Sequence, residues 1–240
     1  MYDFNTRIRY SEVDSKGRLT IVSLVNLFQD CATFHSEDVG FGLEWLSERQ
    51  RGWFVTSYQI RIEEMPYIGE EVRVATYPTS VKGLIGERYF TLTSLDEKKV
   101  YARAKSIWVY MDNIEKKPSR IPDEMGAAYK VGNPPTDEDW GRRKISGLSD
   151  CDKVYDFTVS PLFIDSNHHM NNAYYIEAAM DALPEGYDIG ELRIEYRKPA
   201  ELNNSVHVYE KKEGDVTQIQ LLADDDEMYS IVEFKERKDA

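Results

Sequence analysis

The chain has 240 residues, enough for one large domain or two small ones with real hydrophobic cores. Its net charge of −13, from 43 acidic and 30 basic residues, argues against nucleic-acid binding, which needs a cationic face. No apolar run approaches the roughly 18 residues of a membrane span, and the first residues carry no signal-peptide or transit-peptide pattern. The two cysteines lack zinc-site and disulfide-framework spacing, so we expect a reducing, cytoplasmic location.

The first part of the chain predicts a strand, a helix and a run of antiparallel strands. Residues 4–10 alternate as an opening strand. Gly40 and Gly42 end the helix that follows. Its apolar face is formed by Leu24, Leu27, Phe28, Cys31, Phe34 and His35. Runs rich in β-branched and aromatic residues then predict strands at 53–63, 71–80, 86–95 and 100–111.

Residues 113–150 are polar and rich in proline, which predicts a linker. The same order of elements then returns. A strand is predicted at 154–164 and a helix at 172–183, with Pro184 as its stop. The last strands are predicted at 191–198, 205–212, 216–223 and 227–236.

Between that strand and helix lies a polar stretch, Asp165-Ser166-Asn167-His168-His169-Met170-Asn171-Asn172. It holds a carboxylate, an amide and two imidazoles. Asn171 and Asn172 are good helix N-caps, so one interpretation is a turn that only caps the helix. A strand end that leads into a helix start also gathers backbone N–H groups beside acid and base side chains. This combination suits chemistry on a carbonyl group.

The two halves of the chain repeat at an offset of 151 residues. Residues 13–19 (VDSKGRL) match residues 164–170 (IDSNHHM), and Asp30 matches Asp181 inside the two helices. A repeat of this length indicates a duplicated domain. The first copy has Lys16 and Arg18 where the second has Asn167 and His169, and only the second set suits acid–base work near neutral pH. We therefore expect a binding half followed by a reacting half.

The pattern Asp-x-Asn-x-His-x-Asn-Asn-x-x-Tyr at 165–175 resembles the signature of the acyl-ACP thioesterases. Residues 27–35, 53–63, 91–111 and 119–122 are also similar to stretches of that family, in the same order. The resemblance implies an α+β fold, a tandem (double) hotdog in which two antiparallel sheets each wrap around a long helix. The N-terminal hotdog would span 1–112 and hold the substrate tunnel. The linker would span 113–150 and the catalytic C-terminal hotdog 151–240.

The resemblance also implies an activity and a site. These enzymes hydrolyse the thioester of fatty acyl-acyl carrier protein and release free fatty acid, without a cofactor. Asp165, Asn167 and His169 would be the catalytic residues, and acyl carrier protein the partner. Plant members carry a Glu and a Cys with assigned catalytic roles where this chain has Pro199 and Ala200. A cysteine nucleophile is therefore impossible at that position. A carboxylate from the neighbouring Glu201 would require a shifted turn.

Alternatives stay open at this point. A hotdog hydratase or dehydratase acting on enoyl thioesters would also use an Asp/His pair, and an acyl-chain binding protein without activity would explain the missing Glu and Cys. A metal site of Asp165, His168 and His169 is disfavoured because adjacent histidines seldom bind one ion. His35 and Cys31 are interpreted as core residues. Whether the chain forms a homodimer is left open. The basic clusters that could dock the carrier are Lys116-Lys117, Arg142-Arg143-Lys144 and Arg197-Lys198.

Overall fold

The structure, a computed structural model, describes residues 1–136, 139–141 and 144–237. The chain forms two compact units, each with its own set of antiparallel strands and its own main helix. One unit comprises Met1–Thr56 and Ile62–Trp140, and the other comprises Ser57–Arg61 and Gly141–Ala240. The strand β2 (Arg51–Ile62) contributes its middle residues to the second unit and its ends to the first.

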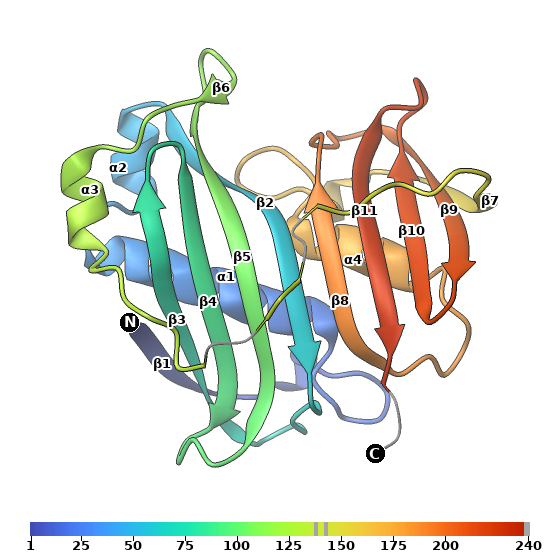
Figure 1. Ribbon diagram of the computed structural model, residues 1–240, viewed down its shortest axis with the longest axis horizontal. Helices are drawn as coiled ribbons and strands as arrows, with labels where there is room; N and C mark the ends of the chain where they lie inside the picture. Colours follow the sequence, from blue (N-terminus) through green and yellow to red (C-terminus); the bar gives the residue numbers. More distant parts are fainter. Residues whose placement is uncertain (137–138, 142–143, 238–240) are drawn as a thin grey trace. The chain divides into compact units, whose positions relative to one another are not determined.

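The first unit is an antiparallel sheet with one long helix on its face. Its strands run in the order β1-β3-β4-β5, and the short β6 pairs with β5. The helix α1 (Ile21–Asp38) contacts β1 and β3 (Figure 1). The strands of this sheet are β1 (Tyr2–Arg7), β3 (Glu71–Lys82), β4 (Ile85–Ser94), β5 (Val100–Asp112) and β6 (Lys117–Pro118).

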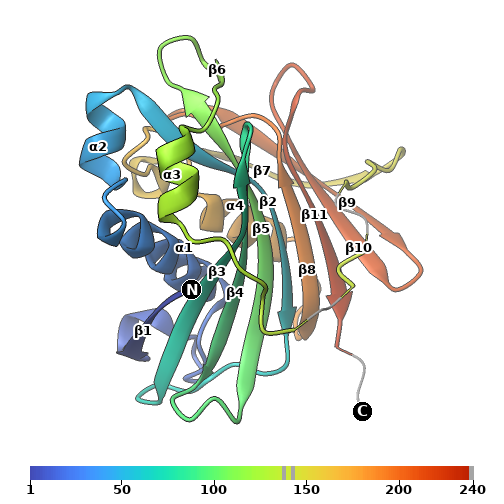
Figure 2. The ribbon, with the colours of Figure 1, turned by 60° about the vertical axis from the view of Figure 1, so that its left-hand side comes forward.

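Helix α1 forms where the apolar spacing predicts it. The Thr20 side chain caps it by accepting a hydrogen bond from the Ser23 N–H, and Gly40 follows its end at φ +82°. Leu24, Phe28 and Cys31 on its predicted apolar face are fully buried, whereas Phe34 is exposed. Two further helices were not predicted. They are α2 (Leu43–Glu48) and α3 (Asp123–Ala128), and α3 lies against β3 (Figure 2).

The second unit repeats this plan. Residues 57–61 of β2 begin a sheet whose order continues β8-β11-β10-β9-β7. The helix α4 (Asn172–Met180) contacts β10 and β11 (Figure 1). The strands of this sheet are β7 (Asp152–Thr158), β8 (Ile189–Tyr196), β9 (Ser205–Glu213), β10 (Val216–Leu222) and β11 (Met228–Glu236).

Two predicted boundaries in this unit are wrong, and both concern the elements around the polar stretch. The strand predicted at 154–164 ends at Thr158, because Pro161 starts a 3-10 turn (Pro161–Phe163) and offers no N–H to a strand partner. The helix predicted to reach residue 183 ends at Met180, with Asp181 as its cap. The polar stretch is therefore preceded by a compact turn rather than by a strand.

Candidate active site

Residues 165–169 close on themselves as a tight polar turn. The Asp165 N–H donates to the His169 carbonyl at 2.9 Å, and the His168 N–H donates to the Asp165 carbonyl at 3.0 Å. The Asp165 carboxylate accepts the Asn167 N–H at 2.8 Å. His168 has a φ of +63°, in the left-handed region that favours glycine. Asp165 therefore holds the backbone that carries Asn167 and His169.

His169, the last residue of this turn, pairs with a residue of the connection between β8 and β9. His169 and Glu201 form an isolated antiparallel bridge, and the adjacent Met170 N–H donates to the Ala200 carbonyl at 2.8 Å. Because this bond flanks the pair instead of joining it, the two side chains are of the narrow type, close together on one face. Glu201 is therefore the residue whose backbone pairs with His169.

The helix that follows the turn begins at the site. Asn171 is its N-cap, as predicted, and its side chain accepts the Ala173 N–H at 2.9 Å. Asn172 is instead the first helical residue, and its carbonyl accepts the Tyr196 hydroxyl at 2.9 Å. The first N–H groups of a helix have no partner within the helix and favour negative charge. In α4 the Ala173 and Tyr174 N–H groups are bonded to Asn171, so this helix start would stabilise a carbonyl oxygen that becomes negative mainly through its positive dipole end.

The first unit contains the same turn with different side chains. There the Asp14 N–H donates to the Arg18 carbonyl at 2.8 Å, and the Asp14 carboxylate accepts the Lys16 N–H at 2.8 Å. Gly17 has a φ of +76° at the position of His168. The Leu19 N–H donates to the Pro66 carbonyl at 2.9 Å, as Met170 does to Ala200. The turn geometry is therefore a property of the duplicated fold and not of the chemistry.

The bridge pair in the first unit shows how side chains meet at this position. Arg18 pairs with Tyr67, the Arg18 Nε donates to the Tyr67 hydroxyl at 3.2 Å, and the guanidinium lies 5.7 Å from the ring centre. The same bridge in the second unit holds an imidazole and a carboxylate. A guanidinium stays protonated in proteins, so only the second unit offers a base at this position.

Replacing His168 by glycine is expected to leave the kcat of the enzyme within about two-fold. The reason is that His168 is not one of the candidate catalytic residues, which are Asp165, Asn167 and His169. The free energy of unfolding should stay the same or rise by up to about 1 kcal/mol, since relief of backbone strain offsets the entropy of glycine. His168→Val is the control and should destabilise, because a β-branched residue is strained at this φ. Steady-state kinetics and urea unfolding measure both. A ten-fold loss of kcat in His168→Gly contradicts a purely backbone role.

The other candidate groups of the sequence are buried in the first unit. The His35 ring is 6 % exposed, stacks on Tyr2, and its Nδ1 lies 3.1 Å from the Arg88 guanidinium. Burial, together with Arg88, lowers the pKa of His35 to about 4. Burial raises the pKa of the Cys31 thiol to about 12. The interpretation of both as core residues is confirmed.

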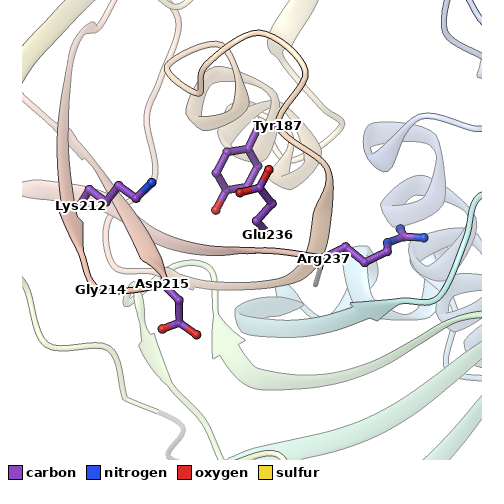
Figure 3. A pocket seen from close by; sticks show the side chains of 6 residues that line it. All are labelled: Tyr187, Lys212, Gly214, Asp215, Glu236 and Arg237. Atoms are coloured by element: carbon purple, nitrogen blue, oxygen red, sulfur yellow. The ribbon is translucent and has the colours of Figure 1, made fainter. Parts of the chain in front are cut away.

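A depression of about 150 Å³ lies in the second unit, and none of the residues that line it belongs to the polar turn (Figure 3). Its lining mixes both charge signs, with Lys212 and Arg237 beside Asp215 and Glu236. The described residues contain no group of three or more His, Cys, Asp or Glu placed to hold a metal ion. No helix in the described part of the chain is long and apolar enough to cross a membrane.

Comparison with known proteins matches both halves to one family. Residues 1–129 match the acyl-ACP thioesterase N-terminal domain, and residues 149–235 match its C-terminal domain. A palmitoyl-acyl carrier protein thioesterase of Gossypium hirsutum is 27% identical over 216 residues, which cover 82% of this chain and 52% of the relative. The chain thus spans about half the length of the curated relatives it matches.

Solved structures confirm the double hotdog fold. A crystal structure of an acyl-ACP thioesterase from Bacteroides thetaiotaomicron superposes with a TM-score of 0.86 at 24% identity, covering 98% of this chain and 97% of the other. The 12:0-ACP thioesterase from Umbellularia californica gives a TM-score of 0.85 at 22% identity, covering 98% and 96%. At these identities the likeness concerns the fold alone.

Proposed function

Because this chain belongs to the acyl-ACP thioesterase family, we propose that it hydrolyses the thioester between a fatty acyl chain and acyl carrier protein. The products are a free fatty acid and the thiol of the carrier. The observation that supports this most is the duplicated turn, which carries acid–base groups only in the second unit. The first unit, with Lys16 and Arg18 in the same geometry, would contribute substrate binding.

The proposed reaction is direct attack by water. His169 takes a proton from water as the water oxygen bonds to the thioester carbon. The carbonyl oxygen becomes negative and is stabilised by the Asn167 amide or by the positive dipole end at the start of α4. The carbon–sulfur bond then breaks, and the imidazolium returns its proton to the leaving thiolate. Asp165 fixes the backbone of Asn167, and Glu201 lies across the backbone bridge from His169.

The test incubates the purified chain with acyl-ACP, acyl-CoA and enoyl-CoA. Release of free thiol from acyl-ACP, with little hydration of enoyl-CoA, supports the proposal. Hydration of enoyl-CoA without thiol release would favour the hydratase alternative. Tight binding of acyl-ACP without turnover would favour a binding protein.

No covalent acyl-enzyme is expected on a cysteine. Ala200, at the position of the family's cysteine, is fully buried, and the raised pKa keeps Cys31 protonated at neutral pH. Burial also raises the pKa of Cys151. Iodoacetamide, and the double replacement Cys31→Ala/Cys151→Ala, should leave kcat within about two-fold. Mass spectrometry of quenched reactions should find unmodified protein. An acyl group on either thiol contradicts the water mechanism.

Docking of the acidic carrier is proposed to use a local basic cluster despite the overall negative charge. Within the described residues, Lys117 pairs with Glu115, and Lys198 pairs with Asp225 and Glu227. Arg197 also pairs with Glu195, so three of the four basic residues in these two clusters have an acidic partner. The third cluster is Arg142-Arg143-Lys144, of which Arg142 and Arg143 lie outside the described residues. We propose it as the docking patch.

If docking is electrostatic, KM for acyl-ACP rises several-fold between low and high ionic strength, because salt screens exposed charges. Hydrolysis of a small acyl thioester should change little over the same range. Lys144→Glu should raise KM for acyl-ACP alone, with Lys117→Glu as the matched control. Equal salt responses for both substrates would rule the docking patch out.

A further inference from the structure

A buried tyrosine links helix α4 to the segment that pairs with the polar turn. Tyr175 lies in the first turns of α4 and is 2 % exposed. Its hydroxyl accepts the Ala200 N–H at 2.7 Å, and Ala200 is itself fully buried. Burial raises the pKa of this phenol, so it stays un-ionised at neutral pH and acts through its position.

The bond matters because Ala200 is tied on both sides. Its N–H goes to Tyr175, and its carbonyl accepts the Met170 N–H. His169 directly precedes Met170, and Glu201 directly follows Ala200. These two neighbours form the bridge. The Tyr175 hydroxyl therefore fixes the backbone of the segment whose next residue, Glu201, bridges to His169.

The first unit provides an internal control for this role. At the offset of 151, the position of Tyr175 is 175 − 151 = 24, which is the buried Leu24. The counterpart of Ala200 is given by the backbone bond and not by the offset: it is Pro66, whose carbonyl accepts the Leu19 N–H and which has no N–H to donate. That unit nevertheless forms the same turn, the same backbone bond and the same bridge. The phenol is therefore not needed to build the turn.

We infer that Tyr175 is a positioning residue, which fixes the 199–201 segment so that Glu201 and His169 face each other for catalysis. This inference rests on the proposed function. The tie between phenol and N–H exists only in the unit that carries the imidazole, and the unit without acid–base groups lacks both partners. Leaving a buried N–H without a hydrogen-bond partner costs free energy. The bond from the Ala200 N–H to the Tyr175 hydroxyl therefore restricts the movement of the 199–201 segment. Small displacements of a reacting group cost large factors in rate.

The test is a double-mutant cycle on the two partners of the bond. Tyr175→Phe removes the acceptor, and Ala200→Pro removes the N–H and copies Pro66. Each single change is expected to lower kcat by about ten-fold or more, as for other supporting contacts, with KM within about two-fold. The double variant should be no slower than the worse single variant, because both changes break one bond. Additive losses, or normal kcat in Tyr175→Phe, would overturn the inference.

Two controls are needed. One distinguishes a positioning role of Tyr175 from a purely structural role, and the other distinguishes failure of this inference from failure of the proposed function. Tyr155→Phe removes another tyrosine hydroxyl bonded to α4, at the Ala178 carbonyl, and should keep kcat while lowering the unfolding midpoint. If Tyr175→Phe behaves like Tyr155→Phe, its role is structural and the inference fails. His169→Gln is measured beside them. An active His169→Gln variant refutes the proposed site, whereas an inactive one beside a normal Tyr175→Phe refutes only the positioning role.

Discussion

Replacing His169 by alanine is expected to lower kcat for acyl-ACP hydrolysis by about 10²-fold or more, the usual loss when a general base is removed. Arg18→Ala, the matched change in the first unit, should leave kcat within about two-fold. Both residues occupy the same bridge position of the same turn, so the two variants remove comparable contacts. They differ in that only the imidazole can accept a proton near neutral pH.

The measurement is thiol release from acyl-ACP under saturating conditions, together with urea unfolding of both variants. The losses of stability should be similar, because Arg18 also contacts Tyr67 across its bridge. A rate loss that appears in both variants would indicate damage to the fold rather than to the chemistry. Near-full activity of His169→Ala would remove His169 from the site.

Local patterns in the sequence were enough to predict most of the elements. The apolar spacing that begins at Leu24 predicted the buried face of α1, and Asn171 predicted the start of α4. The offset of 151 predicted a duplicated unit, and the structure extends this match to individual hydrogen bonds, such as those from the Lys16 N–H to the Asp14 carboxylate and from the Asn167 N–H to the Asp165 carboxylate. Each of these features depends on residues within a few positions of one another, and so the local sequence carries it.

The contacts that complete the candidate site join distant parts of the chain. Glu201 lies 32 positions beyond His169 (201 − 169), and the bond between Tyr175 and Ala200 spans 25 positions. Such pairs depend on how β8 leads into β9, which no local pattern specifies. The short helices α2 and α3 were missed for a related reason. Helices of six residues gain little from intrinsic propensity, and tertiary packing decides whether they form.

The structure also separates two roles that the sequence left open for Asp165, orienting the site or acting as a second base. Its carboxylate already accepts the Asn167 N–H. Asp165 and Asp14 therefore do the same structural work in the two turns, and Asp14 does so in a unit without a base. This similarity favours the orienting role.

Asp165→Ala is accordingly expected to lower kcat by about 10²-fold, because the turn that carries Asn167 and His169 loses the hydrogen bond from the Asn167 N–H to the Asp165 carboxylate. Asp14→Ala should lower the free energy of unfolding by about 1 kcal/mol for each of the two exposed hydrogen bonds that its carboxylate accepts, and keep its kcat within about two-fold. Asp165→Asn keeps a side-chain oxygen that can accept the Asn167 N–H but cannot take up a proton at neutral pH. It should therefore retain most of the activity. If Asp165→Asn is as slow as Asp165→Ala while both stay folded, the carboxylate takes part in proton transfer, and the role assigned here must change from orienting residue to second base.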